Sequence, residues 1–367
     1  MKLIGGSVFG PDGQFHIRDV ATEGGVFTAT AGGPVVNARG CYVIPGLVDI
    51  HTHGAMNADA CDADAQGLLR MSRYYSKMGT TSFLATTMSL PEPALAAALE
   101  TIRDFSPPED GAACLGVHLE GPFLCSAKRG AQAEDHLCRP DASMLRRLQD
   151  GSDGLIRIIT IAPELEGAID FIAQVSQECI VSLGHTACDY DTACQAYNAG
   201  ASHATHLFNA MNPFLHRAPG IVGAALDCGA SAELICDGMH IHPSVVRAAF
   251  CLYGEKLVLI SDSARCAGMP DGDYELGGQP IVVAGGKAML HDGTLAGSSI
   301  CMLTALQKAV QFGIPLEQAV WAATAAPAKA AGLQGRVGFI EPGKQADCLV
   351  LGPDLNLRQV IVRGKVL

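Results

Sequence analysis

Five apolar, strand-like runs of this chain each end in a side chain that can bind a metal ion or transfer a proton. Imidazole and carboxylate groups without a dedicated cysteine cluster are typical of a catalytic rather than a structural metal site. Chemistry delivered from the ends of successive strands is typical of a (β/α)8 barrel. The pattern therefore predicts a metal-dependent hydrolytic centre. The segments are His51-Thr52-His53, His118-Leu119-Glu120, His185, His206 and Asp262.

Two of these segments carry the clearest local signals. Residues two apart on a strand point to the same side, so His51 and His53 can bind one metal, although a polar turn before Gly54 would give the same pattern. Glu120 closes a strongly apolar run, where a buried carboxylate needs a metal or a cation. An exposed loop glutamate is the alternative. His118 shares its face and is either a support for the site or a satisfied core histidine.

The single residues are weaker signals. A lone strand-end histidine is more often structural, but His185 and His206 follow consecutive runs, which favours metal binding together with Glu120. His203 lies three residues before His206 and is expected to point elsewhere. Asp262 is suited to take a proton from water beside a metal and return it to a leaving group. A turn cap within Ser-Asp-Ser is the alternative.

A further group of polar residues is suited to an anionic substrate. Asn209 follows His206, Arg217 lies in a proline-flanked loop, and His240 closes the seventh apolar run. Arg217 and His240 are candidate anion contacts, with a solvated arginine as the alternative. The segment Gly297-Ser298-Ser299 precedes a helical stretch and could offer backbone N–H groups to an anion.

The elements that position these residues alternate between strand and helix over most of the chain. Spacings of about 25–40 residues suit βα units of a parallel barrel. The predicted strands are Val43–Ile50, Thr81–Thr86, Cys114–Glu120, Leu155–Ala162, Cys179–Gly184, Ser202–Phe208, Ala232–Cys236 and Lys256–Ser261. The predicted helices are Asp64–Met78, Glu92–Phe105, Ala142–Asp150, Glu166–Glu178, Asp189–Asn198, Ser244–Tyr253, Ser299–Phe312 and Leu316–Ala330.

Both ends of the chain have a different sequence pattern, in which short apolar runs alternate with glycine-rich turns. Neither end has enough strands to be stable alone, so we expect them to pair. The prediction is an α/β chain with two domains. Residues 1–45 and 336–367 form a small β-sandwich, and residues 46–335 form a (β/α)8 TIM barrel.

Composition limits the other classes. Hydrophobic residues make up 49% and charged residues 17%, which predicts a large buried core. The formal charge of −12 disfavours nucleic acid and anionic membranes as partners. No apolar stretch reaches the about 18 residues of a membrane span. The 14 cysteines lie mostly in apolar runs without any CxxC, which favours free thiols and a reducing, cytoplasmic setting over a disulfide framework.

Taken together, several blocks of sequence resemble the N-acetylglucosamine-6-phosphate deacetylase family of the amidohydrolase superfamily. The likeness covers nearly the whole chain. Its most specific blocks are His118-Leu119-Glu120-Gly121-Pro122-Phe123 and His206-Leu207-Phe208-Asn209-Ala210-Met211. Supporting blocks include 45–54, Gly184-His185-Thr186, Asp237-Gly238-Met239-His240, Ser261-Asp262, 267–272 and 295–299.

The resemblance implies a role for each matching residue. Glu120, His185 and His206 would hold the main metal, and Asp262 would be the catalytic acid/base. His51 and His53 match a pair found in two-metal members, so one or two divalent ions, zinc by expectation, are implied. Arg217 and His240 would reach the neighbouring subunit's substrate, which implies a homodimer. The positions matching sugar-phosphate contacts are Ala131, Gln132, Asn209, Ala210, Arg217, His240, Leu295, Ala296 and Gly297.

The resemblance predicts hydrolysis of the acetamide of N-acetylglucosamine 6-phosphate to glucosamine 6-phosphate and acetate. One alternative is another amidohydrolase that acts on an N-acyl amino acid or a cyclic amide. The fourth predicted strand, Leu155–Ala162, holds no lysine for a carboxylated bridging ligand, which argues against the urease-like branch. The other alternative is a metal-free protein that binds sugar phosphates on the same scaffold.

Overall fold

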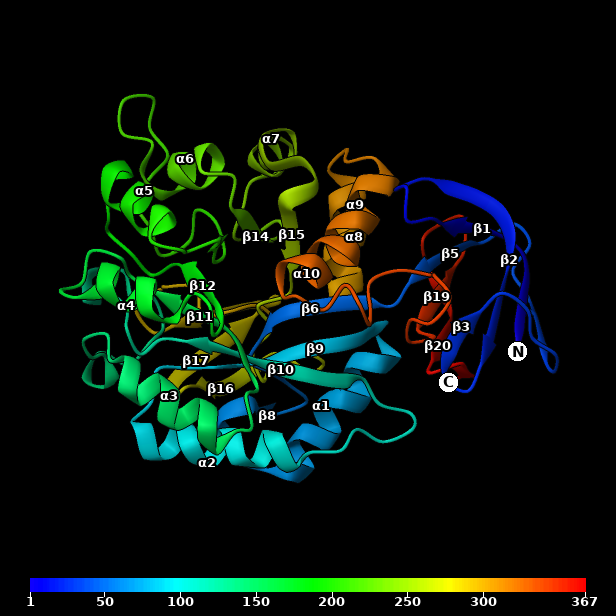
Figure 1. Cartoon of the computed structure of the whole chain (residues 1–367), viewed down its shortest axis with the longest axis horizontal. Helices are drawn as coiled ribbons and strands as arrows, with labels where there is room; N and C mark the ends of the chain where they lie inside the picture. Colours follow the sequence, from blue (N-terminus) through cyan, green and yellow to red (C-terminus); the bar gives the residue numbers. More distant parts are fainter.

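The computed structural model describes all 367 residues and consists of a barrel of eight parallel strands with a second eight-stranded sheet beside it (Figure 1). Each barrel strand pairs with its neighbour in the sequence, in the order given below. This confirms the predicted (β/α)8 fold. The strands are β6 (Leu47–Thr52), β9 (Thr80–Thr87), β10 (Ala113–Glu120), β11 (Ile156–Ile161), β12 (Ile180–Leu183), β13 (His203–Ala204), β14 (Ser231–Ile235) and β15 (Leu257–Ile260).

Helices cover the outside of the barrel; α1 buries one apolar face, whereas α6, α9 and α10 are buried over several consecutive residues. In α1, the side chain of Asp64 caps the N-terminus by accepting from the backbone N–H of Gln66 at 2.9 Å. Leu68, Met71 and Tyr75 repeat at helical spacing and are buried. The helices are α1 (Ala65–Lys77), α2 (Glu92–Asp104), α3 (Ala142–Gly151), α4 (Ala168–Val175), α5 (Tyr190–Asn198), α6 (Gly220–Asp227), α7 (Pro243–Tyr253), α8 (Met302–Gln311), α9 (Leu316–Ala323) and α10 (Ala325–Ala330).

A buried carboxylate joins the first and last barrel strands. No regular ladder pairs β15 with β6. Instead, Asp49 of β6 accepts from the hydroxyl of Ser261 at 2.5 Å and from its backbone N–H at 3.3 Å. The backbone N–H of Asp262 also donates to the carbonyl of His51 at 2.9 Å. These bonds hold the catalytic candidate Asp262 beside the histidine pair.

Two predicted strands have different bounds. The run Val43–Ile50 divides at Gly46 into β5 (Tyr42–Pro45) and β6, because the chain leaves one sheet for the other there. A Cβ atom at Gly46 would lie 2.0 Å from the Thr81 hydroxyl, so only glycine fits this crossing. The run Ser202–Phe208 is a strand only at β13, because the chain turns at His206, where φ is 29°.

Both ends of the chain contribute to the second eight-stranded sheet, as predicted, and both termini lie in it (Figure 1). Strand β19 pairs with β5, which places Cys348 opposite Pro45. Eleven buried residues form a core within this sheet. The predicted boundaries at 45/46 and 335/336 lie close to the crossing and stay a prediction. The strands are β1 (Lys2–Phe9), β2 (Phe15–Glu23), β3 (Val26–Thr28), β4 (Val35–Asn37), β5, β19 (Cys348–Leu351), β20 (Leu357–Val362) and β21 (Lys365–Val366).

Several elements were not predicted from the sequence. Helix α6 follows the proline-flanked loop, and the expected helix Leu316–Ala330 is two helices, because Thr324 has a non-helical backbone. A three-stranded antiparallel sheet follows the eighth barrel strand, and a two-stranded ribbon follows the first. These strands are β16 (Gly272–Leu276), β17 (Gln279–Ala284), β18 (Lys287–Leu290), β7 (Gly54–Ala55) and β8 (Ala58–Asp59).

Two observations bear on the expectations from composition. None of the helices has both the length and the apolar character that crossing a membrane requires. All cysteines are free thiols, and several of them, such as Cys179, Cys236 and Cys348, are buried.

Candidate metal centre and substrate cavity

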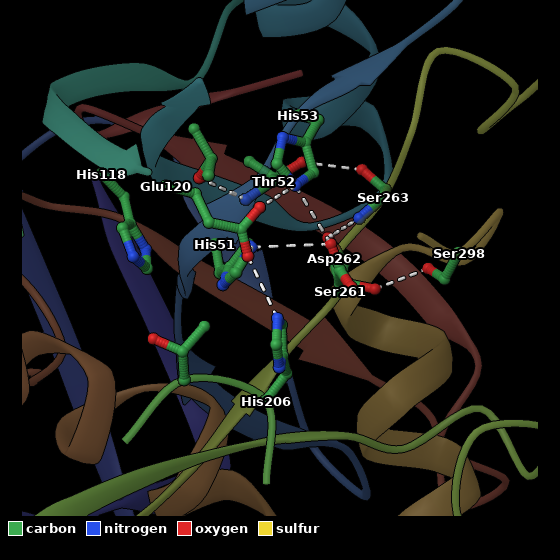
Figure 2. Close-up of polar contacts among 12 residues, drawn as sticks. His51, Thr52, His53, His118, Glu120, His206, Ser261, Asp262, Ser263 and Ser298 are labelled. Atoms are coloured by element: carbon green, nitrogen blue, oxygen red, sulfur yellow. Dashed lines mark hydrogen bonds and ion pairs between the residues drawn. The ribbon is translucent and has the colours of Figure 1, made fainter. Parts of the chain in front are cut away.

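The barrel strands bring six side chains together at their C-terminal ends. The six side chains come from the ends of five strands, so residues up to about two hundred positions apart in the sequence lie in one site. Figure 2 shows His51, His53, Glu120, His206 and Asp262 pointing toward one another. The six are His51, His53, Glu120, His185, His206 and Asp262.

Three of these residues lie just beyond their strands in left-handed backbone conformation. His185 has φ 48°, His206 has φ 29° and Asp262 has φ 48°. Non-glycine residues seldom adopt this conformation, and it is found where a site requires it. The turn ends each strand and directs the side chain across the barrel mouth.

The first group of ligand atoms consists of Glu120, His185 and His206. The Nε2 atoms of His185 and His206 lie 3.1 and 3.0 Å from Oε1 of Glu120, and 3.0 Å from each other. Ligands of one tetrahedral zinc ion, with bonds of about 2.0 Å, would be about 3.3 Å apart. The three atoms therefore fit a single divalent ion. The predicted trio is brought together.

The second group extends from the same carboxylate. The Nε2 atom of His51 lies 3.3 Å from Glu120 Oε1, and that of His53 lies 3.4 Å from Glu120 Oε2. Asp262 Oδ1 lies 3.6 Å from His51 and 3.3 Å from His53. Glu120 thus stands between two sets of donors. His51, His53 and Glu120 form a second group of ligand atoms that could hold a metal ion.

The charges at the centre call for a cation. Burial opposes a positive charge on His51, yet the neighbouring carboxylates raise its pKa well above the ordinary value: these are Glu233, Glu120 and Asp262. For Asp262, burial raises the pKa, but the neighbouring His51 and His53 outweigh burial and lower the pKa below its ordinary value. Asp262 is therefore ionised near neutral pH and able to accept a proton.

Neighbouring groups orient these side chains. Lys128 offers its backbone carbonyl to Nδ1 of His185 at 3.0 Å, which leaves Nε2 for a metal. Gln132 accepts from the backbone N–H of Ser89 at 2.7 Å and donates its amide to Glu120 Oε2 at 2.6 Å. Gln132 therefore contacts the metal-binding carboxylate as well as the cavity.

A cavity of about 490 Å³ opens beside the centre. Most predicted substrate residues line it. Ala296 does not, since it is fully buried behind Leu295 and Gly297. Arg217 does not line this cavity either. Those that do are Ala131, Gln132, Asn209, Ala210, His240, Leu295 and Gly297.

His240 lines the cavity of its own chain. The resemblance implied that it reaches the neighbouring subunit's substrate, and that contact stays a prediction. Its Nδ1 lies 2.7 Å from Asp237 Oδ2. Burial opposes its charge, but this hydrogen bond and the charge of Asp237 raise the pKa of His240. His240 therefore supplies a cation at the cavity wall over a wider pH range.

Sequence reasoning missed several lining residues. Lys128 and Arg129 lie on the loop after Gly-Pro and add two cations, and their adjacent basic side chains were the available signal. Asp292 and Thr294 come from the segment after β18, and Leu276 ends β16. The unpredicted three-stranded sheet therefore forms one wall of the cavity. His203, expected to point elsewhere, contacts Glu233, 3.2 Å away.

The fold and the site define a class: a hydrolytic enzyme with a buried metal centre at the C-terminal end of a (β/α)8 barrel. The amidohydrolase family model matches residues 42–367. The chain is 40% identical to N-acetylglucosamine-6-phosphate deacetylase of Bacillus subtilis (strain 168), over 88% of this chain and 84% of that one. It is 34% identical to N-acetylgalactosamine-6-phosphate deacetylase of Escherichia coli O157:H7, over 97% and 94%.

Solved structures agree. The N-acetylglucosamine-6-phosphate deacetylase of Pasteurella multocida superposes with a TM-score of 0.94 at 30% identity, covering 100% of this chain and 99% of that one. A Mycobacterium smegmatis mutant of this deacetylase, in complex with N-acetyl-D-glucosamine-6-phosphate, gives 0.92 at 31% identity, covering 100% and 98%. The chain belongs to the amidohydrolase family and, within it, to the N-acetylglucosamine-6-phosphate deacetylases.

Proposed function

We propose that this chain hydrolyses the acetamide of N-acetylglucosamine 6-phosphate, releasing acetate and glucosamine 6-phosphate. The observation that carries the proposal is the cluster of Glu120, His185 and His206 at the wall of a cavity that also holds cations. The centre would bind the acetyl end and the cations would bind the phosphate. A cavity of about 490 Å³ is of the size that small ligands use.

The metal centre would be held by Glu120, His185 and His206, with His51 and His53 available for a second ion. We propose zinc, because imidazole and carboxylate donors in a tetrahedral set suit it. A divalent ion supplies two effects here: it polarises the acetyl carbonyl and lowers the pKa of the attacking water.

Asp262 would move the proton. Its Oδ1 lies beside the histidine pair at the cavity wall, and its lowered pKa keeps it ionised. It accepts a proton from the attacking water and returns that proton to the amine nitrogen as the C–N bond breaks. The second transfer is necessary because an amide anion is a poor leaving group.

The phosphate would lie at the part of the cavity wall that carries His240 and Asn209. His240 faces it as a cation, and Asn209 offers an amide that can donate hydrogen bonds. Lys128 and Arg129 raise the local positive potential, which opposes the chain's overall charge of −12. These groups favour a phosphorylated sugar over a free sugar.

We also propose a homodimer in which Arg217 completes the partner's cavity. Arg217 is exposed and lies outside the cavity of its own chain. Two neighbouring apolar side chains on the same loop are also exposed, Phe214 at 46% and Leu215 at 53%. Clustered exposed apolar side chains are typical of a protein interface. A cytoplasmic location stays a prediction.

The central test is Asp262→Asn, assayed for acetate release with metal content measured on the same sample. We expect turnover to fall by about 10²–10⁴-fold, the usual contribution of a general acid/base, with metal retained. Normal turnover in this variant would contradict the assignment. A substrate panel separates the alternatives: the 6-phosphates of N-acetylglucosamine and N-acetylgalactosamine, free N-acetylglucosamine, an N-acyl amino acid and a cyclic amide.

The dimer has its own test. Arg217→Ala should raise KM for N-acetylglucosamine 6-phosphate and leave KM for free N-acetylglucosamine unchanged. Mixing the Asp262→Asn and Arg217→Ala chains under conditions that allow subunit exchange should restore activity, because one hybrid site then has both residues. Absence of any recovery in a mixture shown by mass to contain hybrids would refute the shared site.

A further inference from the structure

A second polar cluster lies behind the metal centre, inside the barrel, and its central residue is Glu233 of β14. Glu233 is fully buried. Its Oε2 atom accepts from Nδ1 of His51 at 2.8 Å and from the backbone N–H of His206 at 3.1 Å. Its Oε1 atom lies 3.2 Å from Nε2 of His203. No lysine or arginine pairs with this carboxylate, so histidines and a backbone amide alone compensate its burial.

The cluster could be read as another metal site, since ligand atoms of His51, His118 and Glu233 lie within 4.8 Å of one another. The hydrogen bonds of His118 argue against this. Its Nδ1 lies 3.0 Å from the carbonyl of Ile50, and its Nε2 lies 2.7 Å from the hydroxyl of Thr160. Both ring nitrogens are therefore engaged within the protein. His118 lies beside His51 in Figure 2, with ring centroids 4.6 Å apart, and packs against it.

The contact with Glu233 determines which nitrogen of His51 can bind a metal. A carboxylate accepts hydrogen bonds, so Nδ1 of His51 carries the proton. When a metal takes the place of the second ring proton, the lone pair is on Nε2. That atom has no hydrogen-bond partner, and it faces Glu120 at 3.3 Å and Asp262 at 3.6 Å. Metal-binding histidines generally donate their other ring N–H to a carboxylate or a carbonyl in this way.

Among the four histidines of the centre, only His51 has a carboxylate behind it. His185 uses a backbone carbonyl, and the Nδ1 atoms of His53 and His206 have no partner. Glu233 nevertheless reaches His206 as well, through its backbone N–H. His206 has a left-handed backbone with φ 29°, and a hydrogen bond to its backbone N–H stabilises this conformation.

We propose that Glu233 is a positioning residue of the metal centre: it holds His51 with Nε2 toward the ion, and it ties the strand end of His51 to that of His206. The inference rests on the proposed metal-dependent function. Glu233 touches neither the cavity nor the predicted substrate residues, so it acts through the ligands. Its loss should therefore weaken metal binding before it alters substrate binding.

The test is Glu233→Gln, which keeps the shape and removes one acceptor oxygen. We expect metal affinity to fall by about 10–100-fold, measured as metal bound per chain across buffered free-metal concentrations. In kinetics, kcat at low free metal should fall and recover in excess metal, with KM for the sugar phosphate unchanged. Glu275→Gln makes the same change on exposed strand β16 and should leave all three quantities unaltered.

A double-variant experiment separates positioning from general structural damage. In a His51→Asn background, Glu233→Gln should cause a smaller further loss of metal affinity, because the histidine it positions is absent. Should Glu233→Gln fail to fold, Glu233→Asp keeps the buried charge but withdraws it by one carbon–carbon bond, and the same loss of affinity is expected. Unchanged metal affinity in the folded variant would overturn the inference while the wild type still binds metal. A wild-type chain that binds no metal would overturn the proposed function and this inference together.

Discussion

Asp49 offers a sharp test of how the barrel closes. It is a fully buried carboxyl that accepts hydrogen bonds from the hydroxyl and backbone N–H of Ser261 across the gap between β6 and β15. Burial raises its pKa from 3.8 to about 7, against the opposing effect of the Ser261 hydrogen bonds. Folding therefore favours the protonated form of this side chain.

The size of the effect follows from linkage. Each pKa unit corresponds to about 1.36 kcal/mol, so the rise from 3.8 to about 7 corresponds to about 4 kcal/mol. Because the folded state holds the proton more tightly than the unfolded state, this contribution is complete below pH 3.8. It is lost progressively as the pH rises through about 7.

The perturbation is Asp49→Asn, which keeps the shape and cannot ionise. The free energy of unfolding of the variant minus that of the wild type should increase by about 4 kcal/mol between about pH 4 and pH 8. Urea denaturation followed by circular dichroism at several pH values measures this difference. Using the difference cancels the titration of groups that both chains share.

The exposed Glu275→Gln variant is the matched control, and its difference from the wild type should stay constant over the same pH range. The reasoning about Asp49 would be refuted if the Asp49→Asn difference were equally constant. Such a result would mean that the Asp49 carboxyl ionises in the folded chain as readily as in the unfolded chain.

Two further predictions address the cavity wall and the barrel interior. In Asp237→Asn the raised pKa of His240 should fall, because its carboxylate partner is lost. His240 then loses its charge at a lower pH, so KM for the 6-phosphate should start to rise at a lower pH than in the wild type. An unchanged dependence of KM on pH would contradict the phosphate role of His240. In Gly184→Ala the new Cβ would lie 2.7 Å from Cβ of Thr205, so the free energy of unfolding, measured by urea denaturation, should fall by about 1–3 kcal/mol. Gly151 has open space around it, so Gly151→Ala is the control and should not lower the free energy of unfolding.

The barrel and the cluster of candidate ligands could be predicted from the sequence because both depend on local patterns. Apolar runs spaced for βα units fix the strands, and an acid or imidazole at a strand end can lie only at the barrel mouth. Glu120, His185 and His206 were found in this way. The resemblance added residues without a strong local signal, such as Ala131, Ala210 and Leu295.

Other features could not be predicted, because they depend on contacts between distant segments. Glu233 reads as one polar residue within a strand, and only the closed barrel places it 2.8 Å from His51. The three-stranded sheet that forms a cavity wall follows the last strand without any chemical motif. Ala296 was predicted to contact substrate; it is fully buried and does not line the cavity, and the contact stays a prediction.

The sequence by itself therefore determined the kind of chemistry, since residue types and their positions at strand ends are local properties. Tertiary structure alone decided which atom of each side chain faces the centre. Glu233 and the Lys128 carbonyl accept hydrogen bonds from Nδ1 of His51 and His185, which leaves Nε2 of each ring for the centre; these partners lie 182 and 57 residues away along the chain. A ring's free lone pair depends on what binds its other nitrogen, and that partner is known only once the barrel is closed.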